Sequence, residues 1–327
     1  MTDIRDTVAS EFDLIARYFK RPVPAGMLGG GDDCALFAVP EGMQVATSTD
    51  LLLESRHFFS DVDPFKLGIK ALAVNLSDLA AMGATPIGCL LGIALPRIDE
   101  CWVKAFADGF YTLVDRHACP LIGGDTTRSE SDIAISVTVF GAVDPAKAMR
   151  RSSACIGDDI WVSGYLGAAD IACSMMLGQM PMDLALLDRT RLALEQPAPR
   201  IDLGKALSAY AHAAIDISDG LAQDLQHILK ASRCGAQLHE SLLPIAPVLQ
   251  GIDPARLRQA ALAGGDVYEL CWTAPIDARE AILKIGQTLQ TPVTRIGSII
   301  SNQQLIVYDS VGSPLIDLPF GFDHFRT

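Results

Sequence analysis

The stretch Asn75-Leu-Ser-Asp-Leu-Ala-Ala-Met-Gly-Ala-Thr-Pro86 guides the interpretation of the whole chain, because it carries an acid within an apolar segment. The apolar residues that lead into it, from Pro64 onward, recur at helical spacing and predict a helix. Asp63 followed by proline is typical of a helix start. A carboxylate buried in such a helix is costly unless it is paired or bound to a metal ion. We therefore expect Asp78 to have partners elsewhere in the chain.

Other aspartates occupy positions of one kind, since each follows a short apolar run or a glycine. Carboxylate oxygens are preferred ligands of Mg²⁺. We hypothesise that these acids meet Asp78 in one cleft and hold divalent cations against the phosphates of a nucleotide. Gly-Asp pairs are also common in turns, which is the alternative interpretation. The aspartates are Asp33, Asp50, Asp125, Asp216 and Asp219.

In the first half of the chain, three segments supply these acids. Gly29-Gly-Gly-Asp-Asp33 lets the backbone bend tightly and approach a ligand, although a turn before a strand over 34–37 explains the same residues. A strand predicted over 44–50 ends in Ser48-Thr-Asp50, which are oxygen donors suited to a hard cation. A short apolar strand then ends at Gly123-Gly-Asp125, where glycine amides can face phosphate oxygens.

The second half offers a further strand that ends at Asp216, with Ser218 and Asp219 at the start of a predicted helix. A helix N-terminus attracts anions, whereas ordinary capping explains Asp219 alone. Among the basic groups, the pair Arg150-Arg151 either holds a phosphate or is a solvated surface pair. His57 either binds an anionic substrate or is a surface group.

The length of 327 residues predicts two domains. A link over 145–151 separates them, so we place an N-terminal domain at 1–148 and a C-terminal domain at 149–327. Helices and strands are expected in both halves without strict alternation, which predicts an α/β fold with α+β character. An amphipathic helix over 4–19 and a plain turn at Gly157-Asp-Asp159 belong to this prediction.

Composition argues against several classes of function. A net charge of -13 disfavours nucleic-acid binding, which needs clustered Lys and Arg. None of the 8 cysteines forms a Cys-x-x-Cys pair, so buried reduced thiols are expected rather than a zinc site or disulfides. No apolar stretch approaches the about 20 residues of a membrane span, and the N-terminus does not resemble a signal peptide. We expect a soluble, cytoplasmic protein.

The sequence contains neither a Gly-x-x-x-x-Gly-Lys-Ser/Thr phosphate-binding loop nor a His-Arg-Asp catalytic loop. A nucleotide site in this chain would therefore depend on acids and metal ions. Phosphoryl transfer suits such a site, because it needs mainly charge neutralisation and alignment of donor and acceptor. Several aspartates that carry Mg²⁺ ions can supply both.

Six motifs in their order along the chain together resemble the thiamine-monophosphate kinase family, of the aminoimidazole-ribonucleotide synthetase superfamily. That resemblance implies a homodimer in which the N-terminal sheets join into a barrel. It also implies ATP-dependent, in-line phosphorylation of thiamine monophosphate to thiamine diphosphate, the last step of thiamine diphosphate biosynthesis, assisted by several Mg²⁺ ions. The motifs are Gly31-Asp-Asp33, Ser48-Thr-Asp50, Lys70–Ala84, Gly123-Gly-Asp-Thr-Thr127, Ile215-Asp-Ile-Ser-Asp-Gly220 and Gly264-Gly-Asp-Val-Tyr-Glu-Leu270.

By the same resemblance, the N-terminal domain binds Mg²⁺ and ATP and dimerises, and the C-terminal domain completes the ATP and substrate site. No residue is assigned as a general base, because the attacking phosphate oxygen is already ionised. The implied ATP-binding residues are Gly124, Asp125, Arg151 and Ser218, and those for thiamine monophosphate are His57, Asp266 and Phe322. The implied Mg²⁺ ligands are Asp33, Ser48, Thr49, Asp50, Asp78, Asp125, Asp216 and Asp219.

The chain departs from the family pattern Gly-Gly-Glu-Asp-Tyr-Glu-Leu at two positions, where it has Asp266 and Val267. Aminoimidazole-ribonucleotide synthetase is the alternative enzyme. Selenophosphate synthetase would need a reactive cysteine near the N-terminus, and the first cysteine of this sequence is Cys34. A hydrogenase-maturation relative would end in cysteine, whereas this sequence ends in Phe-Arg-Thr. Val267 also suggests a different class, a catalytically silent protein that binds nucleotide or Mg²⁺.

Overall fold

The computed structural model describes residues 10–319 and 321–322, which form two compact units. The first unit comprises the described part of Met1–Glu41 with Thr47–Asn75 and Pro86–Gly141. The second comprises Gly42–Ala46, Leu76–Thr85 and the described part of Ala142–Thr327. The predicted α/β class is confirmed, because each of the two sheets is accompanied by helices. The domain boundary at residues 148 and 149 stays a prediction.

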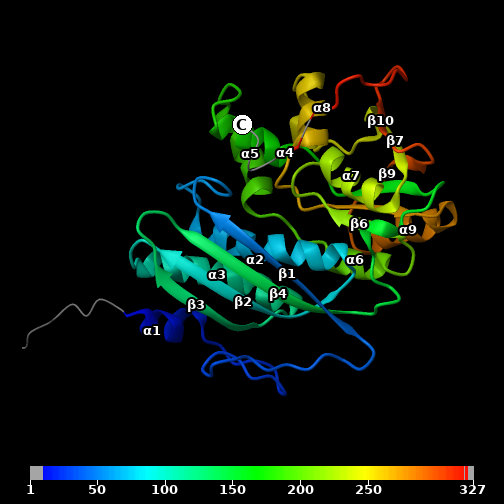
Figure 1. The fold of residues 1–327 in the computed structure, drawn as a ribbon. Coiled ribbons are helices and arrows are strands. Elements are labelled where there is room, and N and C mark those ends of the chain that lie inside the picture. Colours follow the sequence, from blue (N-terminus) through cyan, green and yellow to red (C-terminus); the bar gives the residue numbers. More distant parts are fainter. Residues whose placement is uncertain (1–9, 320, 323–327) are drawn as a thin grey trace, which may run out of the picture. The chain divides into compact units, whose positions relative to one another are not determined.

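The first sheet contains four strands, which are β1 (Gln44–Leu53), β2 (Thr85–Leu95), β3 (Leu121–Arg128) and β4 (Ala134–Val143). Their order is β1-β4-β2-β3, so β1 and β3 are the edges of the sheet. Helices α2 (Pro64–Ala81) and α3 (Glu100–His117) lie on one face of it (Figure 1). The strand order therefore separates acids carried by β1 from acids carried by β3.

Helix α2 begins as the sequence predicts, because the Asp63 carboxylate accepts the backbone N–H of Phe65 at 2.8 Å. The helix is buried over the whole of residues 71–77, and Asp78 is half-buried. Helix α3 also has an acid cap, since Asp99 accepts the N–H of Trp102 at 3.1 Å. Local capping and apolar periodicity thus suffice to specify both helices.

The second sheet contains six strands, β5 (Asp159–Ser163), β6 (Ala213–Asp216), β7 (Gly235–His239), β8 (Leu270–Ala274), β9 (Val293–Ile300) and β10 (Leu305–Tyr308), in the order β10-β7-β9-β5-β8-β6. Its helices are α4 (Ala168–Met176), α5 (Leu184–Glu195), α6 (Ile201–Leu207), α7 (Leu221–Ser232), α8 (Pro254–Ala263) and α9 (Arg279–Thr288). Helix α7 packs against β6 and α8. Buried side chains such as Ile215, Leu225 and Ile299 join the sheet to α7 in one core.

The structure corrects the prediction for the first part of the chain. Residues 4–9 of the predicted helix lie outside the described residues, and the rest forms α1 (Glu11–Leu14) followed by a π-helix at Ile15–Phe19. Phe12 is 77% exposed, whereas Leu14 and Phe19 are buried. The strand expected over 34–37 is wrong, since Leu36 forms only an isolated bridge with Leu28.

Strand β3 does not end at its glycines but continues to Arg128, with Gly124 opposite Leu91 of β2. A Cβ on Gly124 would lie 1.9 Å from the Leu91 carbonyl oxygen, so only glycine allows this close pairing. Three elements, α5, β7 and α8, were not predicted. Among the described helices, none combines the length and apolar character needed to cross a membrane.

Candidate functional site

In the second unit, Asp216 is the last residue of β6, and its side chain is buried. Helix α7 begins at Leu221. Its N-cap residue is Gly220, which has no side chain to cap the helix. The N-cap position is therefore taken by Gly220 and not by Asp219. Instead, Asp224 accepts the backbone N–H groups of the preceding loop, at 3.0 Å from Ser218, 3.1 Å from Asp219 and 3.0 Å from Gly220.

This use of the backbone changes the electrostatic interpretation of the loop. The N–H groups that would attract an anion are already bonded to the Asp224 carboxylate, so a phosphate cannot use them. Burial and, secondly, the neighbouring charge of Asp219 raise the pKa of Asp224 to about 7. The loop therefore carries two neighbouring carboxylates, those of Asp219 and Asp224. Such a site favours a cation, and it attracts phosphate only through a bound cation.

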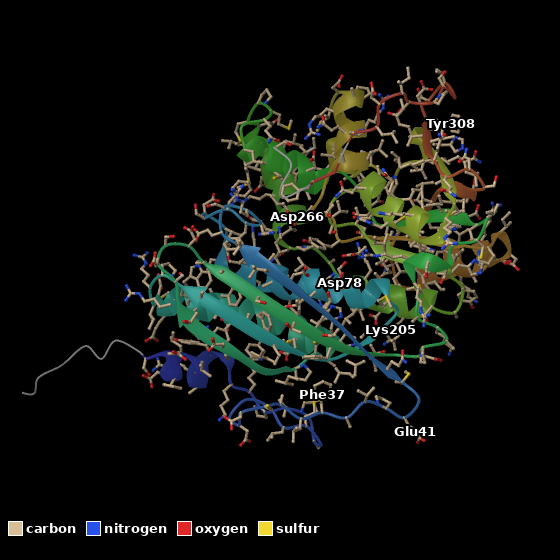
Figure 2. The ribbon with its side chains drawn as sticks, viewed as in Figure 1. Phe37, Glu41, Asp78, Lys205, Asp266 and Tyr308 are labelled. Atoms are coloured by element: carbon tan, nitrogen blue, oxygen red, sulfur yellow. The ribbon has the colours of Figure 1, made fainter. Side chains whose placement is uncertain are left out.

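Two further segments contact this loop through their backbones. The N–H of Asp266 donates to the Ser218 carbonyl at 2.8 Å, and the N–H of Phe322 donates to the Asp219 carbonyl at 3.0 Å. A Cβ on Gly265 would lie 2.6 Å from the Ser218 oxygen, so the close approach requires glycine. The structure therefore brings together the predicted residues of the loop with Asp266 and Phe322. Figure 2 labels Asp266 in the segment between α8 and β8.

The segment between α8 and β8 has an unusual backbone. Asp266 and Tyr268 both adopt left-handed φ angles, of 59° and 54°. Such angles are uncommon for residues other than glycine and mark positions that the surroundings hold in place. Between them, Val267 packs against the hydrophobic core of the unit. The valine that departs from the family pattern is thus a packing residue, whereas the Asp266 carboxylate accepts a hydrogen bond from the Tyr268 hydroxyl at 3.2 Å.

Arg151 lies at the other end of α7. The hydroxyl of Ser232, the last residue of α7, donates to the Arg151 carbonyl at 2.8 Å, whereas Ser218 precedes the first turn of the helix. Twelve helical residues span about 18 Å. The backbones of Arg151 and Ser218 are therefore not neighbours, and a single ligand would have to extend along the helix to contact both.

In the first unit, strand β1 presents its three predicted ligands on two faces. Side chains alternate along a strand, so Ser48 and Asp50 share one face and Thr49 occupies the other. The Thr49 hydroxyl lies 3.0 Å from the Val137 carbonyl, to which it donates, and 2.8 Å from the Thr138 hydroxyl. Thr49 can therefore offer its backbone carbonyl, but not its side chain, to an ion held by Ser48 and Asp50.

Helix α2 supports Asp50 through a residue that was not among the predicted site residues. The buried side chain of Asn75 accepts the backbone N–H of Asp50 at 3.0 Å and donates to the Ala71 carbonyl at 3.2 Å. Asp78 follows Asn75 by three residues, which places both side chains on one face of the helix. The signal in the sequence was the polar residue itself within an apolar helix. Asp224 was missed as well, and no comparable signal marks it.

The remaining predicted acids of the first unit lie on different segments, Asp33 before the first strand and Asp125 on β3. Asp33 and Asp125 are both exposed, and Asp125 lies on β3 beside Gly124. Because β1 and β3 are opposite edges, three strand spacings of about 4.8 Å separate Asp50 from Asp125. One sheet therefore does not bring these two acids onto a single ion.

His57 has a defined orientation beside the end of β1. Its Nδ1 accepts the backbone N–H of Leu53 at 3.0 Å, and its carbonyl accepts from the buried Lys70 ammonium at 3.0 Å. With Nδ1 used as an acceptor, the neutral imidazole carries its proton on Nε2. His57 can therefore donate a hydrogen bond to an anionic group.

Comparison with known proteins places this geometry in a class. Residues 31–143 match the family model of the AIR synthase related protein, N-terminal domain, so this part of the chain is of the AIR-synthase-related class. The thiamine-monophosphate kinase of Escherichia coli K12 is 41% identical over 324 residues, which cover 97% of this chain and 98% of that protein. The chain belongs to the thiamine-monophosphate kinase family and is a phosphotransferase.

Solved structures agree with this assignment. The crystal structure of thiamine-monophosphate kinase from Stenotrophomonas maltophilia K279a matches with a TM-score of 0.82 and 43% identity, covering 90% of this chain and 94% of that chain. A structure of AaThiL complexed with AMPPCP and TMP matches with a TM-score of 0.76 and 27% identity, covering 88% and 89%. The resemblance inferred from the six sequence motifs is confirmed.

Proposed function

We propose that this protein transfers the γ-phosphoryl group of ATP to thiamine monophosphate and so makes thiamine diphosphate, the last step of thiamine diphosphate biosynthesis. The observation that carries the proposal is the convergence of Asp266 and Phe322 on the Ser218–Asp219 loop. This convergence occurs in a chain whose structural relative was solved with AMPPCP and TMP together. Acids on the loop and an aromatic side chain beside them suit a metal-bound phosphate and a cationic thiazolium ring.

The donor atoms of the proposed ligands indicate which metal ion the site would bind. The proposed ligands offer only carboxylate, hydroxyl and backbone oxygens, which fits Mg²⁺ and not a softer metal. Thr49 contributes through its backbone, because its hydroxyl is held by β4. We assign as ligands Asp33, Ser48, Thr49, Asp50, Asp78, Asp125, Asp216 and Asp219.

For the substrates, the roles follow the charges of the groups. Gly124, Asp125, Arg151 and Ser218 bind ATP, with Asp125 acting through metal. His57 donates from Nε2 to the phosphate of thiamine monophosphate, while Asp266 and Phe322 face its cationic ring system. The bound Mg²⁺ ions supply the charge neutralisation that in-line transfer requires. No side chain has to remove a proton, because the acceptor phosphate oxygen is ionised at neutral pH.

The assembly we propose is a homodimer formed through the N-terminal sheets, which join into a barrel. Leu51 and Leu53 project from the same face of edge strand β1, and their side chains are 55% and 37% exposed. The neighbouring Leu52 points to the other face and is buried. An edge strand with exposed apolar residues is a natural surface for pairing with a second copy.

The test is an assay of the purified chain with ATP, Mg²⁺ and thiamine monophosphate, in which thiamine diphosphate and ADP are both quantified. We expect equal amounts of the two products and no turnover after Mg²⁺ is removed with a chelator. ATP binding without any thiamine diphosphate would instead support the silent nucleotide-binding protein. Thiamine in place of its monophosphate serves as the control acceptor, because it lacks the attacking phosphate oxygen.

A further inference from the structure

A second cluster of metal-binding side chains lies in the second unit, away from the Ser218–Asp219 loop of the proposed kinase site. One ligand atom from each of Cys155, Asp158 and His212 lies within 4.8 Å of the others. His212 precedes the first residue of β6, whereas Asp216 is the last residue of that strand. A strand of this length rises about 3.3 Å per residue. The cluster is therefore at the opposite end of β6 from the Asp216 carboxylate.

Cys155 and Asp158 are presented by one tight turn. The Asp158 N–H donates to the Cys155 carbonyl at 3.0 Å, and the Cys155 N–H donates to the Asp158 carboxylate at 2.9 Å. Gly157 supplies the left-handed φ of 93° that closes the turn. The spacing of these two ligands equals that of the Cys-x-x-Cys turns of zinc sites, with a carboxylate in place of the second thiolate.

The third group comes from a distant part of the sequence. His212 Nδ1 lies 3.0 Å from one carboxylate oxygen of Asp158 and 2.9 Å from the other. The backbone N–H of His212 donates to the Thr273 carbonyl at 2.8 Å, which fixes the residue at the edge of the sheet. The Asp158 side chain is only 3% exposed, whereas that of His212 is 38% exposed and Cys155 is exposed. The cluster is thus anchored on its inner side and open to solvent on its outer side.

From this geometry we propose that Cys155, Asp158 and His212 form a Zn²⁺-binding site. A thiolate, an imidazole nitrogen and a carboxylate are the ligand types of zinc, and three protein ligands leave a fourth tetrahedral position for water. Mg²⁺, which takes oxygen ligands, does not suit a site that contains sulfur and nitrogen. The ion would join the 155–158 turn to the residue before β6, two segments that the Asp158–His212 contact already brings together.

A nearby thiol is not part of the proposed site. Cys234 is buried, and its sulfur is not among the three ligand atoms that lie within 4.8 Å of one another. The site therefore differs from the sequence prediction, which expected every cysteine to be a reduced thiol without a metal.

The experiment is a titration of the metal-free, full-length protein with Zn²⁺ against a chromophoric chelator, in excess Mg²⁺ so that oxygen-only sites are filled. We expect one Zn²⁺ per chain, with binding weakened by about 10-fold or more in Cys155→Ser and in His212→Gln. The control is Cys101→Ser, which removes an exposed cysteine of α3 and should bind as the unmodified protein does.

Substitution with Co²⁺ gives a second readout that does not depend on the variants. A thiolate-to-cobalt charge-transfer absorption should appear in the unmodified protein and in Cys101→Ser, and it should be absent in Cys155→Ser. The proposal is overturned if no stoichiometric Zn²⁺ binds, if Cys155→Ser and His212→Gln bind it unchanged, or if the cobalt protein lacks the thiolate band. Because thiamine diphosphate formation is not measured, failure here leaves the proposed kinase reaction untouched.

Discussion

The same tripeptide, Gly-Asp-Asp, occurs at 31–33 and at 157–159, and the structure uses it in opposite ways. In the first copy both aspartates are exposed, and neither forms an ion pair with another described residue. In the second copy both are buried, with side chains 3% and 2% exposed. Asp159 binds Arg279 at 2.7 Å and Arg295 at 3.3 Å, and Asp158 binds His212.

The difference shows that partners, and not the motif, decide what an acid can do. A carboxylate that is buried against two arginines has its charge compensated and holds the fold together. An exposed carboxylate after three glycines keeps its charge available for a ligand. The comparison leads to a rule for the two copies: an acid held by arginines, as Asp159 is, has a structural role, and an exposed acid such as Asp33 stays available to a metal ion.

The largest effect should come from the first copy. Asp33→Asn removes one proposed Mg²⁺ ligand without changing the shape of the side chain. We expect kcat to fall by about 100-fold or more, because charge neutralisation in the transition state is lost. The melting temperature should stay within about 1 °C, since an exposed carboxylate without an ion-pair partner contributes little to stability. Steady-state kinetics and thermal unfolding measure the two quantities.

Asp32 provides the matched control, because it is the adjacent exposed acid and is not a proposed ligand. Asp32→Asn should keep both kcat and the melting temperature. If the two variants lose activity equally, the effect is one of general negative charge and not of a specific ligand. If Asp33→Asn instead unfolds the protein, the comparison between the two tripeptides is wrong.

A substitution in the second copy should lower the melting temperature and leave kcat unchanged. In the native protein Arg279 and Arg295 share the Asp159 carboxylate, which raises the pKa of Arg279. Asp159→Asn removes that charge from both guanidiniums. We expect the melting temperature to fall by about 5 °C, because a charged hydrogen-bonding partner is lost at a buried position. At a temperature where the variant is folded, kcat should match that of the unmodified chain. A large loss of kcat in a folded variant would contradict a structural role.

The sequence predicted this second copy as a plain turn, and the reason for the error is physical. Asp159 is a strand residue, and its partners Arg279 and Arg295 come from over one hundred positions later in the chain. Local pattern cannot reveal such partners. Asp224 was missed for another reason, because its partners are backbone N–H groups only 4 to 6 positions earlier, which no pattern of side chains marks. Helices α2 and α3 were predictable because an acid cap and an apolar repeat lie within their own residues.

The candidate site was predictable in part for a different reason. The motifs identified the loop 215–220 and the segment 264–270 as parts of one site, and the structure shows their backbones bonded to each other. The ligand types alone did not show that the Thr49 side chain is already engaged, because its hydroxyl is held by residues of β4, a distant part of the sequence. The separation of Asp50 from Asp125 depends on the strand order, which the sequence does not contain.

The rule extends to cations and gives a smaller expected effect. Arg279 and Arg295 are engaged with Asp159, whereas Arg151 is exposed and forms no ion pair within the described part of the chain. Arg151→Ala should raise the KM for ATP by about 10-fold through loss of a charged hydrogen bond to phosphate. Arg150→Ala, the adjacent control, should change it by less than about 2-fold. Equal effects of the two variants would mean that the surface charge, and not one contact, attracts ATP.

The smallest effect concerns Val267, where the family has an acid. Because Val267 packs against the hydrophobic core, an aspartate there would bury a carboxylate beside apolar side chains. Val267→Asp should therefore lower the free energy of unfolding by about 1 kcal/mol and leave the KM for thiamine monophosphate unchanged. Val311→Asp is the control, because Val311 is 83% exposed and the same substitution there should cost nothing measurable. A lower KM in Val267→Asp, without loss of stability, would show that the position faces the substrate and that Asp266 does not carry the acceptor contact by itself.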